Sequence, residues 1–322
     1  MNDAVQTDRE MLDCLVIGGG AAGLTAAVYL GRYRRKAVVI DDGGSRLARI
    51  PKTRNVLGFP DGIEGPQLLE RMRVHASRFG TRLEWGRVER LARLEHGGFE
   101  AWAGSHHLRA RTVLLATGAR DVEPDIPGLG PALKAGVVRY CPVCDGYETQ
   151  GQRVAVLGRE VHGLRESMFV AGFDNQVTWL SMGSRHAVVP ADCDRLQALG
   201  VRIDDRVPRA VRCHAQRGVE VEMPDGPPLW FDVLYPALGL VHACELATAL
   251  CARVCDNGQL EVDEHYQSSV AGLYVAGDVA ADLNQINVAA GQAAIATTAI
   301  HNSLGATAPR LTSPGPLHRG IS

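Results

Sequence analysis

The sequence predicts an α/β protein of two domains, each built on a strand, a turn, a helix and a second strand. Residues 12–42 and 153–180 carry this prediction, because in each segment an apolar run enters a turn, a helical pattern follows, and a second apolar run ends the unit. The length of 322 residues agrees with two domains. Hydrophobic residues make up 46% of the chain and charged residues 22%, which is the balance of a folded protein with a substantial core.

The first unit has the features of a dinucleotide-binding turn. Its strand runs directly into the sequence GxGxxG, formed by Gly18, Gly20 and Gly23. In such a turn the first glycine permits a tight bend, the second lets a pyrophosphate approach the backbone, and the third packs the helix on the strand. The second strand, at residues 37–40, ends in Asp41, where a carboxylate can bond a ribose hydroxyl. Strand, glycines, helix and acid together predict a bound dinucleotide.

The second unit keeps the frame of the first but not its chemistry. Its turn, residues 158–163, has Glu160 where the middle glycine would lie. Two unit charges about 4 Å apart repel by roughly 4 kcal/mol at an effective dielectric of 20, so a carboxylate there opposes a pyrophosphate. After the second strand, residues 181–183 provide neither an acid for a ribose nor paired basic residues for a phosphate, and Arg185 is the one nearby cation. We therefore expect this site to be degenerate and NADP(H) not to be required.

Cys141 and Cys144 form a Cys-x-x-Cys pair in a chain of eight cysteines. On the first turn of a helix, the helix dipole and the neighbouring thiol favour the thiolate form of such a pair. Asp145 follows directly and could carry a proton to or from a sulfur. Half of a zinc site and a static disulfide are the alternatives, but zinc would need two further ligands at a suitable spacing, and we expect no metal. Four other cysteines are expected to be small buried residues: Cys14 in an apolar strand, and Cys244, Cys251 and Cys255 in one helix.

Two further strands indicate which dinucleotide binds the first unit. Residues 112–119 and 272–278 each run from an apolar strand into a turn of small residues, and both resemble segments of the two-dinucleotide flavoproteins. That resemblance implies that the nucleotide is FAD and that Asp278 bonds its ribityl chain. It also implies two Rossmann-like dinucleotide-binding domains, the second inserted in the first: an FAD-binding domain of residues 1–120 and 241–322, and an NAD(P)-binding-like domain of residues 121–240.

The whole pattern resembles the low-molecular-weight thioredoxin reductases. Those proteins share the GxGxxG turn, a CxxCDG motif directly before a second βαβ unit, and a later AGD segment, here residues 276–278. The resemblance implies a homodimer in which Cys144 faces the flavin, Cys141 exchanges with the substrate, and Asp145 is the acid–base group. It also implies contacts with FAD from the following residues: Gly18, Gly20, Ala22, Gly23, Asp41, Arg46, Leu47, Asn55, Thr117, Gly118, Asp278, Gln285 and Ile286.

Departures from those reductases change the expected function. The nucleotide signature of the second unit is damaged, and Asn284 stands where the reductases carry arginine. The chain is also similar to flavin-dependent dithiol oxidases of natural-product pathways, the gliotoxin, holomycin and romidepsin type, which carry a Gly-aromatic-Glu stretch, here residues 146–148. That resemblance implies formation of a disulfide in a small-molecule or peptide dithiol, with O2 as final acceptor. The alternatives are a reductase of a thioredoxin-like protein, fed by ferredoxin or NADPH, and a flavin-binding sensor without catalysis.

Charge and composition narrow the expected partners and location. The net charge is −2 with no basic run, so we expect no attraction to nucleic acid or to an anionic membrane. Residues 1–10 lack the basic start and apolar core of a signal peptide, and no apolar stretch is long enough to span a bilayer. A cytoplasmic location is therefore expected. The tail, residues 308–322, is expected to lack fixed structure or, in a dimer, to cover the flavin.

Overall fold

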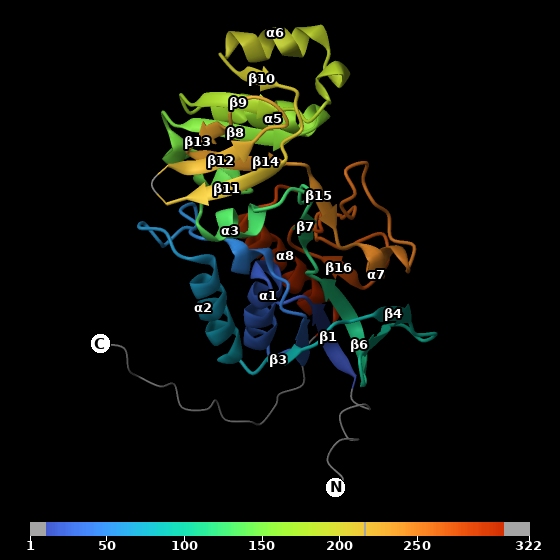
Figure 1. The fold of residues 1–322 in the computed structure, drawn as a ribbon. Helices are drawn as coiled ribbons and strands as arrows, with labels where there is room; N and C mark the ends of the chain where they lie inside the picture. The colour runs from blue at the N-terminus through green and yellow to red at the C-terminus, as the bar shows by residue number, and fades with distance from the viewer. Residues whose placement is uncertain (1–10, 216, 306–322) are drawn as a thin grey trace, which may run out of the picture.

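The computed structural model describes residues 11–215 and 217–305, which form two bodies joined by a narrow ribbon (Figure 1). The larger body is built on a seven-stranded sheet of order β3-β2-β1-β6-β5-β4, with β16 also paired to β6. β1, β2, β3, β6 and β16 are parallel, whereas β4 and β5 are antiparallel to their neighbours. The strands are β1 (Leu12–Ile17), β2 (Ala37–Asp41), β3 (Arg82–Trp85), β4 (Arg90–Arg93), β5 (Phe99–Ala103), β6 (His106–Leu115) and β16 (Leu273–Val275).

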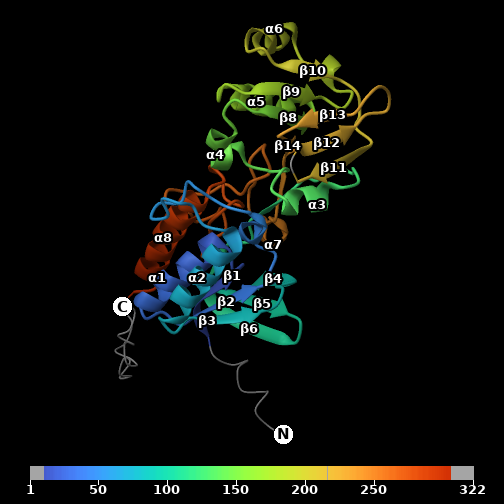
Figure 2. The same cartoon turned by 60° about the vertical axis from the view of Figure 1, so that its left-hand side comes forward.

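Three helices lie together on one side of this sheet, as the two views agree (Figures 1 and 2). The alternation along β1 explains the packing: Cys14 and Val16 are buried against the helices, while Leu15 and Ile17 are buried in the cluster on the opposite face. Small alanines on the first helix let it approach the sheet closely. The helices are α1 (Ala21–Arg32), α2 (Gly65–Ser77) and α8 (Ile286–Ser303), with the short η2 (Arg46–Arg49) between β2 and α2.

The smaller body contains a parallel sheet of order β10-β9-β8-β14 and an antiparallel sheet of order β11-β12-β13. Trp179 is fully buried, and its Nε1 donates to the carbonyl of Gly158, which fixes the turn after β8. The strands are β8 (Arg153–Gly158), β9 (Gln176–Leu180), β10 (Arg202–Asp204), β11 (Ala210–His214), β12 (Gly218–Glu222), β13 (Leu229–Phe231) and β14 (Val233–Ala237). The helices are α3 (Leu129–Lys134), α4 (Pro142–Asp145), η3 (Tyr147–Thr149), α5 (Glu160–Ala171), η4 (Arg185–Ala187) and α6 (Pro190–Ala198).

The ribbon consists of two antiparallel strands, β7 (Ala119–Asp121) and β15 (Leu240–His242), which lie between the bodies in Figure 1. The chain enters the smaller body after β7 and returns through β15, so the larger body is built from two separate stretches of chain. The domain boundaries at residues 120/121 and 240/241 stay a prediction. The α/β fold with two Rossmann-like units, one inserted in the other, is therefore the fold observed.

The region after β15 differs from its prediction. α7 (Glu245–Thr248) is only four residues long, so Cys251 and Cys255 lie outside the helix that was expected to hold them. Cys251 is exposed and has a φ of +62°. The N–H of Ala252 bonds back to the carbonyl of Ala247, a pairing that closes the helix with a left-handed residue. The apolar composition of this segment indicated a helix but contained no signal for where it ends.

The sequence predictions about a signal peptide and about the tail concern the two ends of the chain. Residues 1–10 and the tail, 308–322, lie outside the described residues. Within the part of the chain that the structure describes, no helix has both the length and the apolar character needed to cross a bilayer.

Candidate functional site

The turn between β1 and α1 is fixed by its first and last glycines. Gly18 has a φ of +107°, and a Cβ at this position would lie 2.2 Å from the carbonyl oxygen of Ala116. A Cβ at Gly23 would lie 1.8 Å from the oxygen of Gly18, so the close approach of helix and strand excludes any side chain. Gly20 is the N-cap of α1 and makes no side-chain cap bond. The first N–H groups of this 12-residue helix are thus available to an anion.

A cavity of about 310 Å³ lies between this turn and the cysteine pair. Two of the predicted cofactor contacts, Gly23 and Asn55, do not line it. Gly23 packs inside the turn, and the side chain of Asn55 bonds that of Gln285. Cys141, Cys144 and Asp145 line the cavity together with most of the predicted cofactor contacts. Those contacts are Gly18, Gly20, Ala22, Asp41, Arg46, Leu47, Thr117, Gly118, Asp278, Gln285 and Ile286.

Carboxylates at the ends of two strands contribute hydrogen-bond acceptors to the cavity. Asp41 ends β2, accepts the N–H of Gly43 and lies 3.0 Å from a guanidinium nitrogen of Arg73. Asp278 follows β16, and its Oδ2 lies 2.7 Å from Nη1 of Arg46. A glycine cradle, an open helix N-terminus and two acids on one elongated cavity are the groups that bind the pyrophosphate and hydroxyls of a dinucleotide. The residues present therefore fit FAD.

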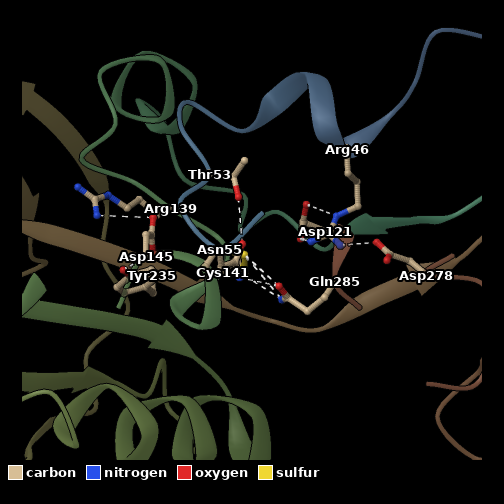
Figure 3. Close-up of a disulfide and its surroundings, with 11 residues drawn as sticks. Arg46, Thr53, Asn55, Asp121, Arg139, Cys141, Asp145, Tyr235, Asp278 and Gln285 are labelled. Carbon is tan, nitrogen blue, oxygen red and sulfur yellow. Dashed lines mark hydrogen bonds and ion pairs between the residues drawn. A yellow bond between two sulfur atoms is a disulfide. The ribbon is translucent and has the colours of Figure 1, made fainter. Parts of the chain in front are cut away.

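The cysteine pair lies at the start of α4 (Figure 3), as predicted. Cys141 is the N-cap of this helix and Cys144 belongs to its first turn. The two sulfurs are bonded at 2.09 Å, with the Cα atoms 5.3 Å apart. Within residues 11–215 and 217–305 there is no cluster of three or more acidic, histidine or cysteine side chains that could hold a metal ion.

Asp145 is positioned by two side chains that were not identified from the sequence. The hydroxyl of Tyr235, in β14, donates to Oδ1 of Asp145 at 2.6 Å, and Nη1 of Arg139 lies 3.5 Å from Oδ2 (Figure 3). Burial raises the pKa of Asp145, and the charge of Glu148 adds to this effect, while Tyr235 and Arg139 oppose it. The carboxyl therefore keeps its proton to a higher pH than an ordinary aspartate, which suits a group that exchanges protons with thiols.

A second carboxyl, the half-buried Glu166 of α5, lies in the electrostatic range of Asp145. Burial raises the pKa of Glu166 to about 7, and the charge of Asp145 contributes to this rise. The sequence offered no signal for Glu166, because an acid at one position of a helix is usually a solvated residue.

Ion pairs join the loop after β2 to the ribbon and to the smaller body. Each pair connects separate parts of the chain, and the one at Glu148 lies three residues after the end of α4. The pairs are Arg46 with Asp121, Arg49 with Glu123, and Arg54 with Glu148.

The turn between β8 and α5 is occupied by the chain's own side chains. The N–H of Glu160 donates to the hydroxyl of Ser184 at 2.9 Å, and that hydroxyl donates to the carbonyl of Ser181. Asp205 accepts bonds from the Ser181 hydroxyl and from the N–H of Arg185. The Ser181 hydroxyl is the main cause that lowers the pKa of Asp205, so this loop holds a carboxylate. A nucleotide phosphate here would meet occupied donors and negative charge.

The model of the pyridine nucleotide-disulphide oxidoreductase family matches residues 12–293. The chain belongs to this family. Family membership makes it a flavin-dependent disulfide oxidoreductase with FAD as the family's cofactor, and the disulfide across Cys141 and Cys144 agrees with that class.

Similar proteins place this family member near the thioredoxin reductases. Thioredoxin reductase from Bacillus subtilis is 25% identical, with 92% of this chain and 96% of the relative covered. An alkyl hydroperoxide reductase protein of Pseudomonas putida is 29% identical over 92% of this chain, which spans only 59% of that relative's length. Among solved structures, thioredoxin reductase from Streptococcus pyogenes is 26% identical, with a TM-score of 0.84. The match covers 91% of this chain and 98% of that chain. The solved structure of HlmI is 28% identical, with a TM-score of 0.85, and the match covers 92% of this chain and 94% of that chain.

Proposed function

We propose that this family member is a dithiol oxidase that forms a disulfide in a small-molecule or peptide substrate without NADP(H). The observation that carries the proposal is the hydrogen bond from the Glu160 N–H to Ser184, at the position where a pyrophosphate would bind in a working second site. The carboxylates of Glu160 and Asp205 add repulsion at the same turn. Electrons must therefore enter through the cysteine pair rather than from a nicotinamide.

The first half of the reaction is thiol–disulfide exchange. A substrate thiolate attacks Cys141, the Cys141–Cys144 bond breaks, and Cys144 leaves as a thiolate. The second substrate thiolate then attacks its own partner sulfur in the mixed disulfide, which closes the product and releases Cys141. Two electrons pass from the substrate to the pair, and Asp145 accepts and returns thiol protons during these steps.

FAD held in the cavity would supply the acceptor for the electron pair. O2, as the final acceptor, would take that pair with two protons to give hydrogen peroxide. The chain's own part is to hold that group next to the sulfurs. The open N-terminus of α1 would bind the pyrophosphate, Asp41 a ribose and Asp278 the ribityl chain. Cys141 and Cys144 line the same cavity, so exchange and electron transfer take place at one site.

A thioredoxin-like protein as substrate is the second candidate function. Similarity to the thioredoxin reductases of B. subtilis and S. pyogenes supports it. In that case ferredoxin or NADPH would feed electrons to the flavin, and the pair would reduce the partner protein. A homodimer and a cytoplasmic location are compatible with both functions and stay predictions.

One anaerobic experiment separates the two directions of flow. The purified protein is mixed either with excess NADPH or with a small dithiol, and the flavin absorbance near 450 nm is followed on the order of seconds. We expect bleaching by the dithiol alone, followed by hydrogen peroxide when air is admitted. Rapid bleaching by NADPH would contradict the oxidase. The Cys144→Ser protein serves as the control and should not bleach with dithiol.

A further inference from the structure

The side chain of Gln285 contacts both sulfurs of the cysteine pair (Figure 3). Its Nε2 lies 3.6 Å from the sulfur of Cys141 and 3.7 Å from that of Cys144. Gln285 is the N-cap of α8, so its backbone is fixed at the start of an 18-residue helix. The sulfurs of a disulfide carry no hydrogen, so only the amide N–H groups of Gln285 can donate in this contact.

A relay of polar side chains sets the orientation of the Gln285 amide. An isolated amide could turn and present its oxygen to the sulfurs instead. Asn55 opposes this turn, because its Nδ2 donates to Oε1 of Gln285 at 2.9 Å. The hydroxyl of Thr53, which is fully buried, donates to Oδ1 of Asn55 at 3.0 Å and holds the Asn55 side chain in place. Nδ2 of Asn287 bonds the carbonyl of Asn55 and holds its backbone in place.

We propose that Gln285 is a catalytic residue that stabilises the thiolate of the opened cysteine pair, and that Asn55 and Thr53 are its positioning residues. When a substrate dithiol reduces the pair, its two thiols lose two electrons and two protons and become a disulfide. The S–S bond of the pair accepts both electrons and one proton, which leaves one thiol and one thiolate, and the second proton goes to solvent. A hydrogen bond to that thiolate is charge-assisted, and the positive end of α8 adds to it.

The proposal rests on the proposed function only in requiring that the pair be reduced during turnover. Its direct measure is the chemistry of the reduced pair itself, irrespective of what then accepts the electrons. Loss of the Gln285 donor should disfavour the thiolate and therefore the reduced state. A carboxylate placed opposite the sulfurs should disfavour the thiolate and the reduced state more strongly still.

The first test compares full-length wild-type protein with Gln285→Leu and Gln285→Glu. Two quantities are measured: the pH midpoint of iodoacetamide alkylation at the two cysteines, by mass spectrometry, and the equilibrium of the pair with glutathione. A hydrogen bond to a charged group changes an equilibrium constant by roughly tenfold or more. Gln285→Leu should therefore move the pH midpoint of alkylation up by about one unit and shift the equilibrium with glutathione toward the disulfide by about tenfold. Gln285→Glu should exceed both changes. A midpoint within about 0.3 pH unit of wild type and an equilibrium constant within about twofold, in both variants, would overturn the role of Gln285.

The second test examines the relay. Asn55→Asp replaces the donor with an acceptor, so the Gln285 amide should turn its oxygen to the sulfurs and shift both quantities in the same direction. The double variant Gln285→Leu/Asn55→Asp should match Gln285→Leu within about twofold, since Asn55 then has nothing to orient. Fully additive losses would overturn the positioning role. Gln197→Glu, an exposed change in α6, adds the same charge and should leave both quantities unchanged.

The outcomes also separate this proposal from the dithiol oxidase. A protein that NADPH bleaches rapidly, but whose Gln285 variants show the expected shifts, would contradict the oxidase and keep the role of Gln285. A protein that the dithiol bleaches, but whose variants show no shift, would do the reverse.

Discussion

The two strand–turn–helix units share their packing glycines and differ in the residue between them. A Cβ at Gly23 would lie 1.8 Å from the oxygen of Gly18, and a Cβ at Gly163 would lie 2.5 Å from the oxygen of Gly158. Both turns therefore need glycine where helix and strand meet. At the central position a Cβ on Gly20 would lie 3.2 Å from Oγ of Ser45, whereas in the second unit the position is Glu160, whose N–H is bonded to a serine. Two such units can thus share the packing glycines while differing at the central position that faces a ligand.

The helices that follow the two turns differ in the same sense. α1 buries alanine, leucine and glycine and has no acid in its first turn. α5 begins with Glu160, at a φ of +47°, and carries the half-buried Glu166 toward Asp145. The second helix thus begins with an acid where the first has none, and it carries Glu166 within electrostatic range of Asp145.

The largest expected effect comes from giving the first turn the residue of the second. Gly20→Glu places a carboxylate at the open N-terminus of α1, where roughly 4 kcal/mol of repulsion corresponds to about a thousandfold loss of FAD affinity. The protein should purify without flavin, which its absorbance near 450 nm reports. Gly130→Glu, at an exposed glycine with open space around it, is the matched control and should retain flavin. Flavin retained in Gly20→Glu would show that the first turn does not bind the cofactor.

Next in size is Glu166→Gln, which makes α5 more like α1. The pKa of Glu166 is raised from 4.5 to about 7, so the folded state holds its proton more tightly than the unfolded state does. Stability from this group is complete below pH 4.5 and is lost as the pH rises through 7. Removing the charge should therefore stabilise the protein at pH 8 by about 3 kcal/mol and have little effect at pH 4. Denaturant unfolding at the two pH values measures this, and an equal change at both would contradict it.

A smaller gain is expected from restoring the second turn. Glu160→Gly with Ser184→Ala removes the carboxylate and frees the backbone N–H, and glycine suits the positive φ at this position. We expect NADPH to bind about tenfold more tightly, a modest gain because Asp205 remains in the loop. Calorimetric titration measures the affinity. An affinity within about twofold of wild type would contradict the role of Glu160 and Ser184 in opposing NADPH.

The smallest effect concerns the proton carried by Asp145. Tyr235→Phe removes a hydrogen bond that lowers the pKa of Asp145, so the inflection that Asp145 gives to the pH–rate profile should move to higher pH. Glu148→Gln removes a charge that raises the pKa of Asp145 and should move the inflection to lower pH. Shifts of the same sign in both variants would contradict this account.

The sequence predicted the parts of the site that local patterns encode. The glycine turns, the alternating strands and the cysteines at a helix start follow from the spacing of neighbouring residues, and the structure has each of them. Partners brought together by the tertiary fold left no such pattern. Tyr235 lies 90 residues from Asp145 and reads as one more apolar residue of a buried strand, and Gln285 lies 141 residues from Cys144. Glu160 was identified as an obstacle to a nucleotide, but the serine that bonds its N–H was not.

The ribbon of β7 and β15 makes the inserted unit a replaceable module. Asp121 pairs with Leu240 across this ribbon, so the points where the chain leaves and re-enters the larger body are neighbours. Antiparallel strands can be joined by a turn of two residues, so a direct connection from β7 to β15 could replace the insert. Changes within the second unit can therefore leave the strand order around the first undisturbed.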